Sequence, residues 1–371
     1  MDSAVTSLRL NPFKGCDGPE GSPVPWSPYG RILSERPNFT LDPLFHAGCY
    51  YVQDSSAMFV GHLFRKLALG VSGYFRGSAP KQPHMSRTCK VLDLCAAPGG
   101  KTTDIAASCR EALGDAFELT ANEVIKARAN ILAGNVAAWG DPAVTVTSVD
   151  PAVIGRTMKG YYDVIVADVP CSGEGMFRKD PRAVEEWTPQ LPGICAARQK
   201  RILADAWPAL KEGGLLIYST CTYEDCENDA NLEWAARELG GEIIPPEDEF
   251  PEYGVRLTRH GSLLKAGEVP GEGQWAGALR KTSGAPQARC RLADLRPLES
   301  RIQIFDGPEP KVELDLQQSL KYLHGDSFPL PGAPLGMLVV CYRSHPLGYV
   351  KNLGPRCNNL YPKGRRIRMD V

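Results

Sequence analysis

The chain has 371 residues and a formal net charge of -1, from 42 basic and 43 acidic side chains. This length fits two or three domains, and the balanced charge leaves any nucleic-acid binding to local basic patches. The hydrophobic fraction of 43% and the charged fraction of 23% are typical of a soluble globular protein. No run approaches the ~20 apolar residues of a transmembrane helix. Because the first residues also lack the pattern of a signal peptide, we expect a cytoplasmic protein without a membrane partner.

Twelve cysteines and six histidines are scattered along the chain. Disulfide frameworks are typical of short secreted chains, and no paired CxxC motif occurs here. No Cys/His cluster has the spacing of zinc ligands, so we predict no metal site. Most of the cysteines are expected to be small, buried hydrophobic residues. Cys171 and Cys221 need a different explanation.

The first 88 residues, which we treat as an N-terminal region, show the least regular pattern. Residues 11–43 are rich in Pro and Gly, which predicts irregular structure apart from short pieces of order. Residues 46–69 predict a helix, because apolar side chains recur at helical spacing in its second half. Residues 70–87 are again typical of a loop.

Strands and helices then alternate from Cys89 to Lys281. This alternation predicts βαβ units, and so an α/β domain of the Rossmann-like type, with a mainly parallel sheet and helices on both faces. The expected strands are 90–94, 117–122, 144–147, 162–167 and 215–218. One expected helix begins at about residue 101, and the others span 124–132, 193–210 and 226–239. After a linker at 282–287, short β-like runs such as 337–342 predict a small separate α+β domain at 291–371.

A glycine-rich turn follows the first expected strand. Residues 91–102 read V-L-D-L-C-A-A-P-G-G-K-T, which places backbone N–H groups and a helix N-terminus at the carboxyl end of a strand. A P-loop is disfavoured because Cys95 stands where its first glycine is required, and the dinucleotide motif GxGxxG is absent. The remaining interpretation is a loop for S-adenosylmethionine (SAM), formed by Cys95, Ala96, Ala97, Pro98, Gly99, Gly100 and Lys101.

Two acids stand where a SAM-binding sheet would need them. Glu123 ends the second strand, where a carboxylate can accept hydrogen bonds from both ribose hydroxyls. Asp150 follows the third strand and is placed to meet the adenine amino group. Either acid alone is more often a helix cap or a solvated charge. The loop and the two acids, however, follow three successive strands, and together they favour a SAM site.

Cys171 and Cys221 each follow an apolar strand, and Asp168 lies three residues before Cys171. A lone cysteine there is usually a buried turn residue. Two cysteines at the ends of strands expected to be neighbours would instead converge beside the cofactor. Such a pair suits methylation of carbon 5 of cytosine, because a thiolate that adds to carbon 6 makes carbon 5 nucleophilic. Asp168 could then bind the cytosine amino group and ring nitrogen 3.

These motifs resemble the Sun/Fmu family of RNA 5-methylcytosine methyltransferases, and within it the bacterial branch of small-subunit methyltransferase F type. The resemblance runs from about Trp26 to Met369 and includes residues 46–56, 95–101, 172–181, 218–222 and 271–276. It implies that Cys221 is the nucleophile, that Cys171 assists release of the adduct, and that Asp168 also contacts SAM. Val169 and Asp54 depart mildly from the family pattern, without removing a group that the chemistry needs.

The last segment is locally basic, with seven Lys/Arg and one acid from Arg343 onward. On charge alone a basic tail is more often a solvated terminus, but the resemblance implies a C-terminal RNA-binding (PUA-like) domain here. Arg178 and Lys179, near the reacting cysteines, are candidates for phosphates that flank the target base. The other expected RNA-binding residues are Lys351, Arg356, Tyr361, Lys363, Arg365 and Arg366.

The function expected from sequence is SAM-dependent methylation of carbon 5 of cytidine in RNA through a covalent cysteine–cytosine intermediate. By resemblance the substrate is small-subunit ribosomal RNA, with the small ribosomal subunit as a further partner, and the protein is expected to act as a monomer. Two alternatives stay open: the same chemistry on transfer RNA, and a non-catalytic RNA-binding factor for ribosome assembly that retains the SAM fold.

Overall fold

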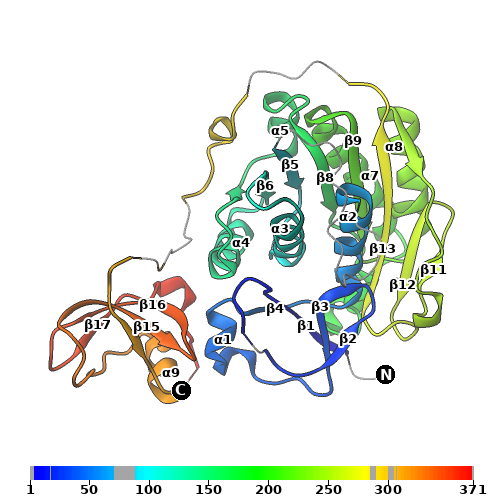
Figure 1. Cartoon of the computed structure of the whole chain (residues 1–371). Helices are drawn as coiled ribbons and strands as arrows, with labels where there is room; N and C mark the ends of the chain where they lie inside the picture. Colours follow the sequence, from blue (N-terminus) through cyan, green and yellow to red (C-terminus); the bar gives the residue numbers. More distant parts are fainter. Residues whose placement is uncertain are drawn as a thin grey trace.

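A computed structural model describes residues 4–16, 18–70, 88–284, 290–299, 305 and 307–369. The described residues form three sheets, one in each part of the chain (Figure 1). The loop expected at 70–87 lies outside the described residues apart from Gly70, and so do residues 285–287 of the expected linker. Among the described residues, no helix combines the length and apolarity needed to cross a membrane.

The N-terminal sheet has the strand order β2-β3-β1-β4, and β2 and β3 are short pieces of order within the mostly irregular segment 11–43. Gly30 lies within β3, where a Cβ atom would come within 2.7 Å of the Val24 side chain. Glycine at this position therefore permits close packing. The strands are β1 (Thr6–Leu10), β2 (Ser22–Val24), β3 (Ser27–Leu33) and β4 (Tyr50–Val52).

The helix predicted over 46–69 is correct only in its second half. The short helix α1 (Pro43–His46) and strand β4 occupy the first part, and α2 (Phe59–Leu69) follows a 3-10 turn, η2 (Ser56–Met58). The apolar spacing that predicted the helix comes from α2 alone.

The central sheet has the order β11-β12-β13-β9-β8-β5-β6-β7, and β10 pairs with β13. Its five strands from β9 to β7 are parallel and match the expected strands, whereas β10 to β13 add an antiparallel half. The parallel strands are β5 (Cys89–Asp93), β6 (Phe117–Asn122), β7 (Val144–Thr147), β8 (Tyr162–Asp168) and β9 (Leu210–Thr220). The others are β10 (Gly241–Ile244), β11 (Arg256–Leu257), β12 (Gly261–Lys265) and β13 (Gly273–Lys281).

Alternate residues of the parallel strands pack on opposite faces of the sheet, as the period of two requires. Val164 and Val166 share one core with residues of α2, α3 and α4, whereas Ile165 and Ala167 share another with residues of α5, α7 and α8. The helices of this part are α3 (Gly100–Leu113), α4 (Lys126–Trp139), α5 (Pro151–Thr157), α6 (Pro181–Glu186), α7 (Leu191–Ala206) and α8 (Asp229–Leu239). Helices on both faces confirm the predicted α/β class.

The C-terminal sheet has the order β14-β15-β16-β17 and packs with helix α9, which confirms the α+β prediction. Its apolar residues share a core with the N-terminal region, where Leu44 and Tyr50 pack in the same cluster as Tyr322 and Leu338. Figure 1 shows this part beside α1. Its elements are β14 (Lys311–Glu313), α9 (Leu316–His324), β15 (Gly336–Tyr342), β16 (His345–Asn352) and β17 (Cys357–Asn359).

Short 3-10 helices connect many of these elements. They are η1 (Phe39–Leu41), η3 (Glu174–Met176), η4 (Trp207–Ala209), η5 (Asp225–Glu227), η6 (Pro251–Tyr253), η7 (Leu292–Leu295) and η8 (Lys363–Arg365). Two of them shift the predicted helix bounds, because η4 closes the helix expected to reach residue 210 and η5 opens the one expected to start at 226.

The cysteines follow the prediction in part. Cys89, Cys109, Cys195, Cys341 and Cys357 are buried and free, as expected for small hydrophobic residues. Cys16 and Cys49, however, form a disulfide, which the sequence reasoning did not predict. The two lie 33 residues apart in sequence, and only the N-terminal sheet brings them together.

Candidate active site

The cofactor loop turns between β5 and α3 at Gly99, whose φ of +115° requires glycine. Helix α4 holds this loop in place: Arg128 donates a hydrogen bond to the Ala97 carbonyl (3.0 Å), and Asn135 donates one to the Pro98 carbonyl (2.8 Å). The first turn of α3 therefore starts at the carboxyl end of the sheet, where its free N–H groups can meet a polar ligand.

Two buried carboxyl groups flank this loop. Asp93 ends β5 and accepts a hydrogen bond from the Thr102 hydroxyl (2.6 Å), while its Oδ1 atom has no hydrogen-bond partner among the described residues. Burial raises the pKa of Asp93 to about 7. Glu123 follows β6, accepts from the backbone N–H of Ile125 (2.9 Å), and lies 3.3 Å from Arg128. SAM carries polar and cationic groups. The site suits such a ligand because it combines the glycine turn, Glu123 and the unpartnered Asp93 oxygen.

Asp150 is placed differently from its neighbours. It is exposed and caps α5, accepting a hydrogen bond from the backbone N–H of Ala152 (2.8 Å). This is the ordinary role of an aspartate before a helix, so the contact with adenine stays a prediction.

The two candidate reacting cysteines meet as the sequence predicted. Strands β8 and β9 are parallel neighbours, with Asp168 opposite Ser219, and Cys171 and Cys221 follow their ends. Their Sγ atoms lie 3.2 Å apart, and the backbone N–H of Cys221 points to Cys171 Sγ at 3.3 Å. The hydrogen bond with Cys221, together with burial, holds the pKa of Cys171 well above its usual range. Cys171 is therefore a protonated thiol beside Cys221.

Asp168, at the end of β8, lies at the centre of a polar cluster that joins this strand to α3, β9 and β13. Its Oδ2 atom lies 2.8 Å from the ammonium of Lys101, and its Oδ1 atom accepts from Ser219 (2.8 Å) and Gln274 (3.2 Å). Burial opposes the charge of Lys101, but Asp168 and then Cys221 outweigh it, so the pKa of Lys101 is raised. Gln274, on β13, was absent from the predicted site, because its strand belongs to the antiparallel half of the sheet.

The loop after Cys171 ties the two cysteine-bearing strand ends together. Glu174 accepts hydrogen bonds from the Thr222 hydroxyl (2.7 Å) and the Tyr223 N–H (2.6 Å), and Gly175 N–H donates to the Cys221 carbonyl (2.7 Å). Because a Cβ atom on Gly175 would lie 3.0 Å from that carbonyl oxygen, glycine lets the loop approach Cys221 closely. Sequence reasoning assigned Glu174 and Gly175 to the family motif without giving them this role.

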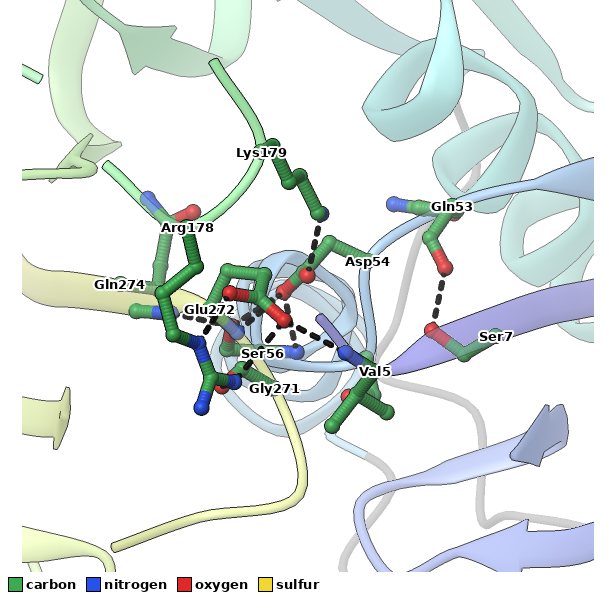
Figure 2. A network of polar contacts seen from close by, with 12 residues as sticks. Val5, Ser7, Gln53, Asp54, Ser56, Arg178, Lys179, Gly271, Glu272 and Gln274 are labelled. Atoms are coloured by element: carbon green, nitrogen blue, oxygen red, sulfur yellow. Dashed lines mark hydrogen bonds and ion pairs between the residues drawn. The ribbon is translucent and has the colours of Figure 1, made fainter. Parts of the chain in front are cut away.

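Arg178 and Lys179, expected to contact RNA phosphates, are instead paired with carboxylates of this chain (Figure 2). Arg178 meets both oxygens of Glu272, at 2.7 and 2.9 Å, and Lys179 lies 2.7 Å from Asp54. Glu272 also accepts from the N–H of Val5 (2.7 Å). The cysteine loop is thereby fastened to the N-terminal region, and any contact of these two cations with RNA stays a prediction.

Three family models match successive parts of the chain. The N-terminal domain of 16S rRNA methyltransferase RsmF matches residues 1–55, 16S rRNA methyltransferase RsmB/F matches 82–239, and the methyltransferase RsmF PUA domain matches 309–367. The chain belongs to the RsmB/F methyltransferase family. The resemblance inferred from the sequence motifs is confirmed.

Two curated relatives, from Shigella boydii serotype 18 and Escherichia coli K12, are named ribosomal RNA small subunit methyltransferase F. Each is 34% identical over 274 residues, which cover 71% of this chain and 52% of the relative. The chain thus spans about half the length of the curated relatives it matches.

Two solved structures share the fold at 24% identity. A methyltransferase homologue from Pyrococcus horikoshii has a TM-score of 0.56 over 76% of this chain and 87% of its own. NSun6 from the same organism, with SFG, has a TM-score of 0.53 over 67% of this chain and 57% of its own. These likenesses confirm the SAM-dependent methyltransferase fold, and SAM is the cofactor of this class, as the loop motif predicted.

The C-terminal part of this RsmB/F family member is the predicted PUA-like domain, but its basic residues are not equivalent. Lys351, Arg356 and Lys363 are exposed, whereas Arg365 and Arg366 are half-buried, and Arg365 donates to the His46 carbonyl (3.1 Å). Tyr361, which was expected to bind RNA, lies inside the domain. Its side chain is 2% exposed and packs against Tyr322 in the domain core, a placement that a lone aromatic residue in a basic segment does not reveal.

Proposed function

We propose that this chain is a SAM-dependent methyltransferase that methylates carbon 5 of cytidine in RNA through a covalent cysteine–cytosine adduct. The observation that carries the proposal is the 3.2 Å approach of Cys171 and Cys221 beside the Lys101–Asp168 ion pair. Two thiols at neighbouring strand ends suit addition to a ring carbon followed by elimination from it. The names of the relatives favour small-subunit ribosomal RNA as the substrate.

In this proposal the Cys221 thiolate bonds to carbon 6 of the flipped cytosine, and carbon 5 gains nucleophilic character. Asp168, 30% exposed at its side chain, binds the cytosine amino group and orients the ring. The ammonium of Lys101, held close by, offsets negative charge in the site during the addition. Bound SAM supplies an electrophilic methyl group, held by residues 95–101, Glu123, Asp150 and Asp168.

Cys171 suits the second half of the reaction. Its raised pKa arises first from the hydrogen bond with Cys221. That influence ends once the Cys221 sulfur is bonded to carbon 6, so Cys171 becomes easier to ionise when a base is needed. We propose that Cys171, directly or through water, takes the proton from carbon 5. The electron pair of that C–H bond restores the ring double bond, and the carbon–sulfur bond breaks to release the Cys221 thiolate.

A methyl-transfer assay with labelled SAM tests this proposal on small ribosomal subunits, naked small-subunit RNA and transfer RNA from cells that lack the protein. Label at carbon 5 of cytidine in the subunit or its RNA is the expected result. Label only in transfer RNA would instead support the second candidate substrate. Absence of label in every RNA would favour the alternative of a non-catalytic binding factor for ribosome assembly, against which the intact Cys171, Cys221 and Asp168 argue.

Adduct trapping tests the two cysteine roles separately. Cys221→Ala should abolish both methylation and any covalent RNA adduct, whereas Cys171→Ala should accumulate that adduct on a denaturing gel. The reverse pattern would exchange the roles of Cys171 and Cys221.

We further propose that the protein acts as a cytoplasmic monomer on the small subunit, with parts at 1–88, 89–281 and 291–371.

A further inference from the structure

A second group of reactive side chains lies outside the active site, where the N-terminal region meets the C-terminal domain. Cys16 follows β1, Cys49 immediately precedes β4, and His345 is the first residue of β16. The two sulfur atoms and a ring nitrogen of His345 all lie within 4.8 Å of one another. The two cysteines are 33 residues apart, and the histidine comes from the far end of the chain, so the fold brings metal-type ligands to one point.

The chemistry of these ligands suits zinc. Thiolate and imidazole are its preferred protein ligands, at about 2.3 Å for sulfur and about 2.0–2.1 Å for nitrogen. A tetrahedral ion then separates its ligand atoms by roughly 3.5–4 Å, which the observed spacing can accommodate by side-chain rotation. Two thiolates balance the charge of Zn²⁺, so the occupied site would be neutral. A neutral site is favourable here because burying a net charge costs free energy. Cys49 is 0% exposed, and Cys16 and His345 are half-buried.

The disulfide between Cys16 and Cys49 is the competing state of the same sulfur atoms. Forming it removes two protons and two electrons, and so needs an oxidant. If the chain modifies ribosomal RNA as proposed above, it works where glutathione and thioredoxin keep thiols reduced. Under those conditions the two thiols face the imidazole.

We propose that the reduced protein binds one Zn²⁺ through Cys16, Cys49 and His345, with water as the fourth ligand. Each thiol releases its proton to solvent as its Zn–S bond forms, and His345 binds as neutral imidazole. Because the ligands come from the N-terminal region and from the C-terminal domain, the ion fastens these two parts together. It adds to a junction that already shares an apolar core and the Arg365–His46 hydrogen bond.

The experiment uses the full chain carrying Cys171→Ser and Cys221→Ser, because the active-site thiols lie close enough to bind zinc themselves. This protein is reduced with a phosphine, stripped with a chelator, and titrated with Zn²⁺ against a chromophoric competitor. One equivalent should bind, and Co²⁺ in its place should give sulfur-to-cobalt charge-transfer absorption. His345→Ala and Cys16→Ser, each added to this background, should weaken binding at least ~10-fold.

Cys226→Ser and His324→Ala are the matched controls, since Cys226 is exposed and neither residue belongs to the cluster. Both should bind zinc as the background protein does. The proposal is overturned if the reduced background protein binds no zinc, or if His345→Ala binds it unchanged. The cobalt spectrum of the background protein reports thiolate ligands even if a cluster variant fails to fold. Since no RNA is present, a negative result leaves the proposed methyl transfer intact.

Discussion

The Nζ atom of Lys101 lies 2.8 Å from Oδ2 of Asp168, so one ion pair joins the cofactor loop to the reacting strand end. Lys101 is the second residue of α3, and Asp168 is the last residue of β8. The pair is therefore held by the two elements that also position the candidate cofactor and Cys171. Any shift of the loop moves the charge that faces the cysteines.

Lys101→Met should lower methyl transfer by about 100-fold or more, because it removes a fixed positive charge from a partly buried site. Asp168 would also be left without its ion-pair partner, so the melting temperature should fall. Single-turnover methylation measures the first effect and thermal unfolding the second. Lys211→Met breaks a similarly exposed pair with Asp163 elsewhere on the sheet and should leave the rate unchanged. Equal loss in both variants would assign the effect to stability alone.

Alkylation of Cys171 should shift to lower pH in Cys221→Ala. The hydrogen bond with Cys221 is the first cause of the raised pKa of Cys171, with burial second, and the substitution removes the former. Mass spectrometry of the Cys171 peptide after iodoacetamide treatment at a series of pH values measures the shift. The exposed Cys226 serves as the internal reference. An unchanged profile would mean that burial alone protects Cys171.

The parallel half of the sheet and the meeting of Cys171 with Cys221 were predictable because they depend on local patterns. Apolar runs alternating with helices specify βαβ units, and parallel strands end on one edge. Lys101–Asp168 and Gln274–Asp168, in contrast, join residues 67 and 106 positions apart, and no spacing rule connects them.

The features that the sequence did not reveal have physical causes of the same kind. Glycine is common in loops, whereas Gly30 serves close packing inside β3, and the sequence alone does not distinguish the two settings. Arg178 and Lys179 looked available to phosphates because Glu272 and Asp54, their partners, lie on other elements. Local charge in the sequence cannot show whether a cation is already paired in the fold.

Asp93→Asn should change how stability depends on pH. The pKa of Asp93 is raised to about 7 in the folded protein by burial, above the ~3.9 of an unfolded chain. The unfolded chain therefore loses this proton first, and the free energy of unfolding falls as pH rises from about 4 to 7, by up to about 4 kcal/mol. Asn carries no charge, so the variant should lack this component. Urea unfolding at pH 5 and pH 7.5 compares the two proteins, and parallel pH dependence would contradict the assignment.

Lys351, Arg356 and Lys363 should together carry part of the RNA affinity, because they are the exposed members of the basic segment. Every phosphate that is no longer neutralised lowers the slope of log affinity against log salt by about 0.7 for single-stranded RNA. Replacing all three with Gln should thus reduce the slope by up to about 2, as measured by filter binding between low and moderate salt. The control variant removes three exposed charges from the central domain instead, at Lys159, Arg201 and Arg237. Matching slopes for the two triple variants would remove the basic segment from the RNA interface.

Glu272→Gln should uncouple the cysteine loop from the N-terminal region. Arg178 is 18% exposed at its side chain and meets both Glu272 oxygens, so the substitution leaves a largely buried cation poorly compensated, which typically costs about 3–5 kcal/mol. If Arg178 only positions the loop, Glu272→Gln should lower kcat with little change in KM. Arg178→Lys should then keep part of the unmodified protein's kcat. If Arg178 contacts phosphates instead, Arg178→Lys should raise KM and weaken the salt dependence of binding. Arg182→Lys, in an exposed pair with Asp180, should alter neither constant, because a solvated ion pair contributes little to the position of a loop.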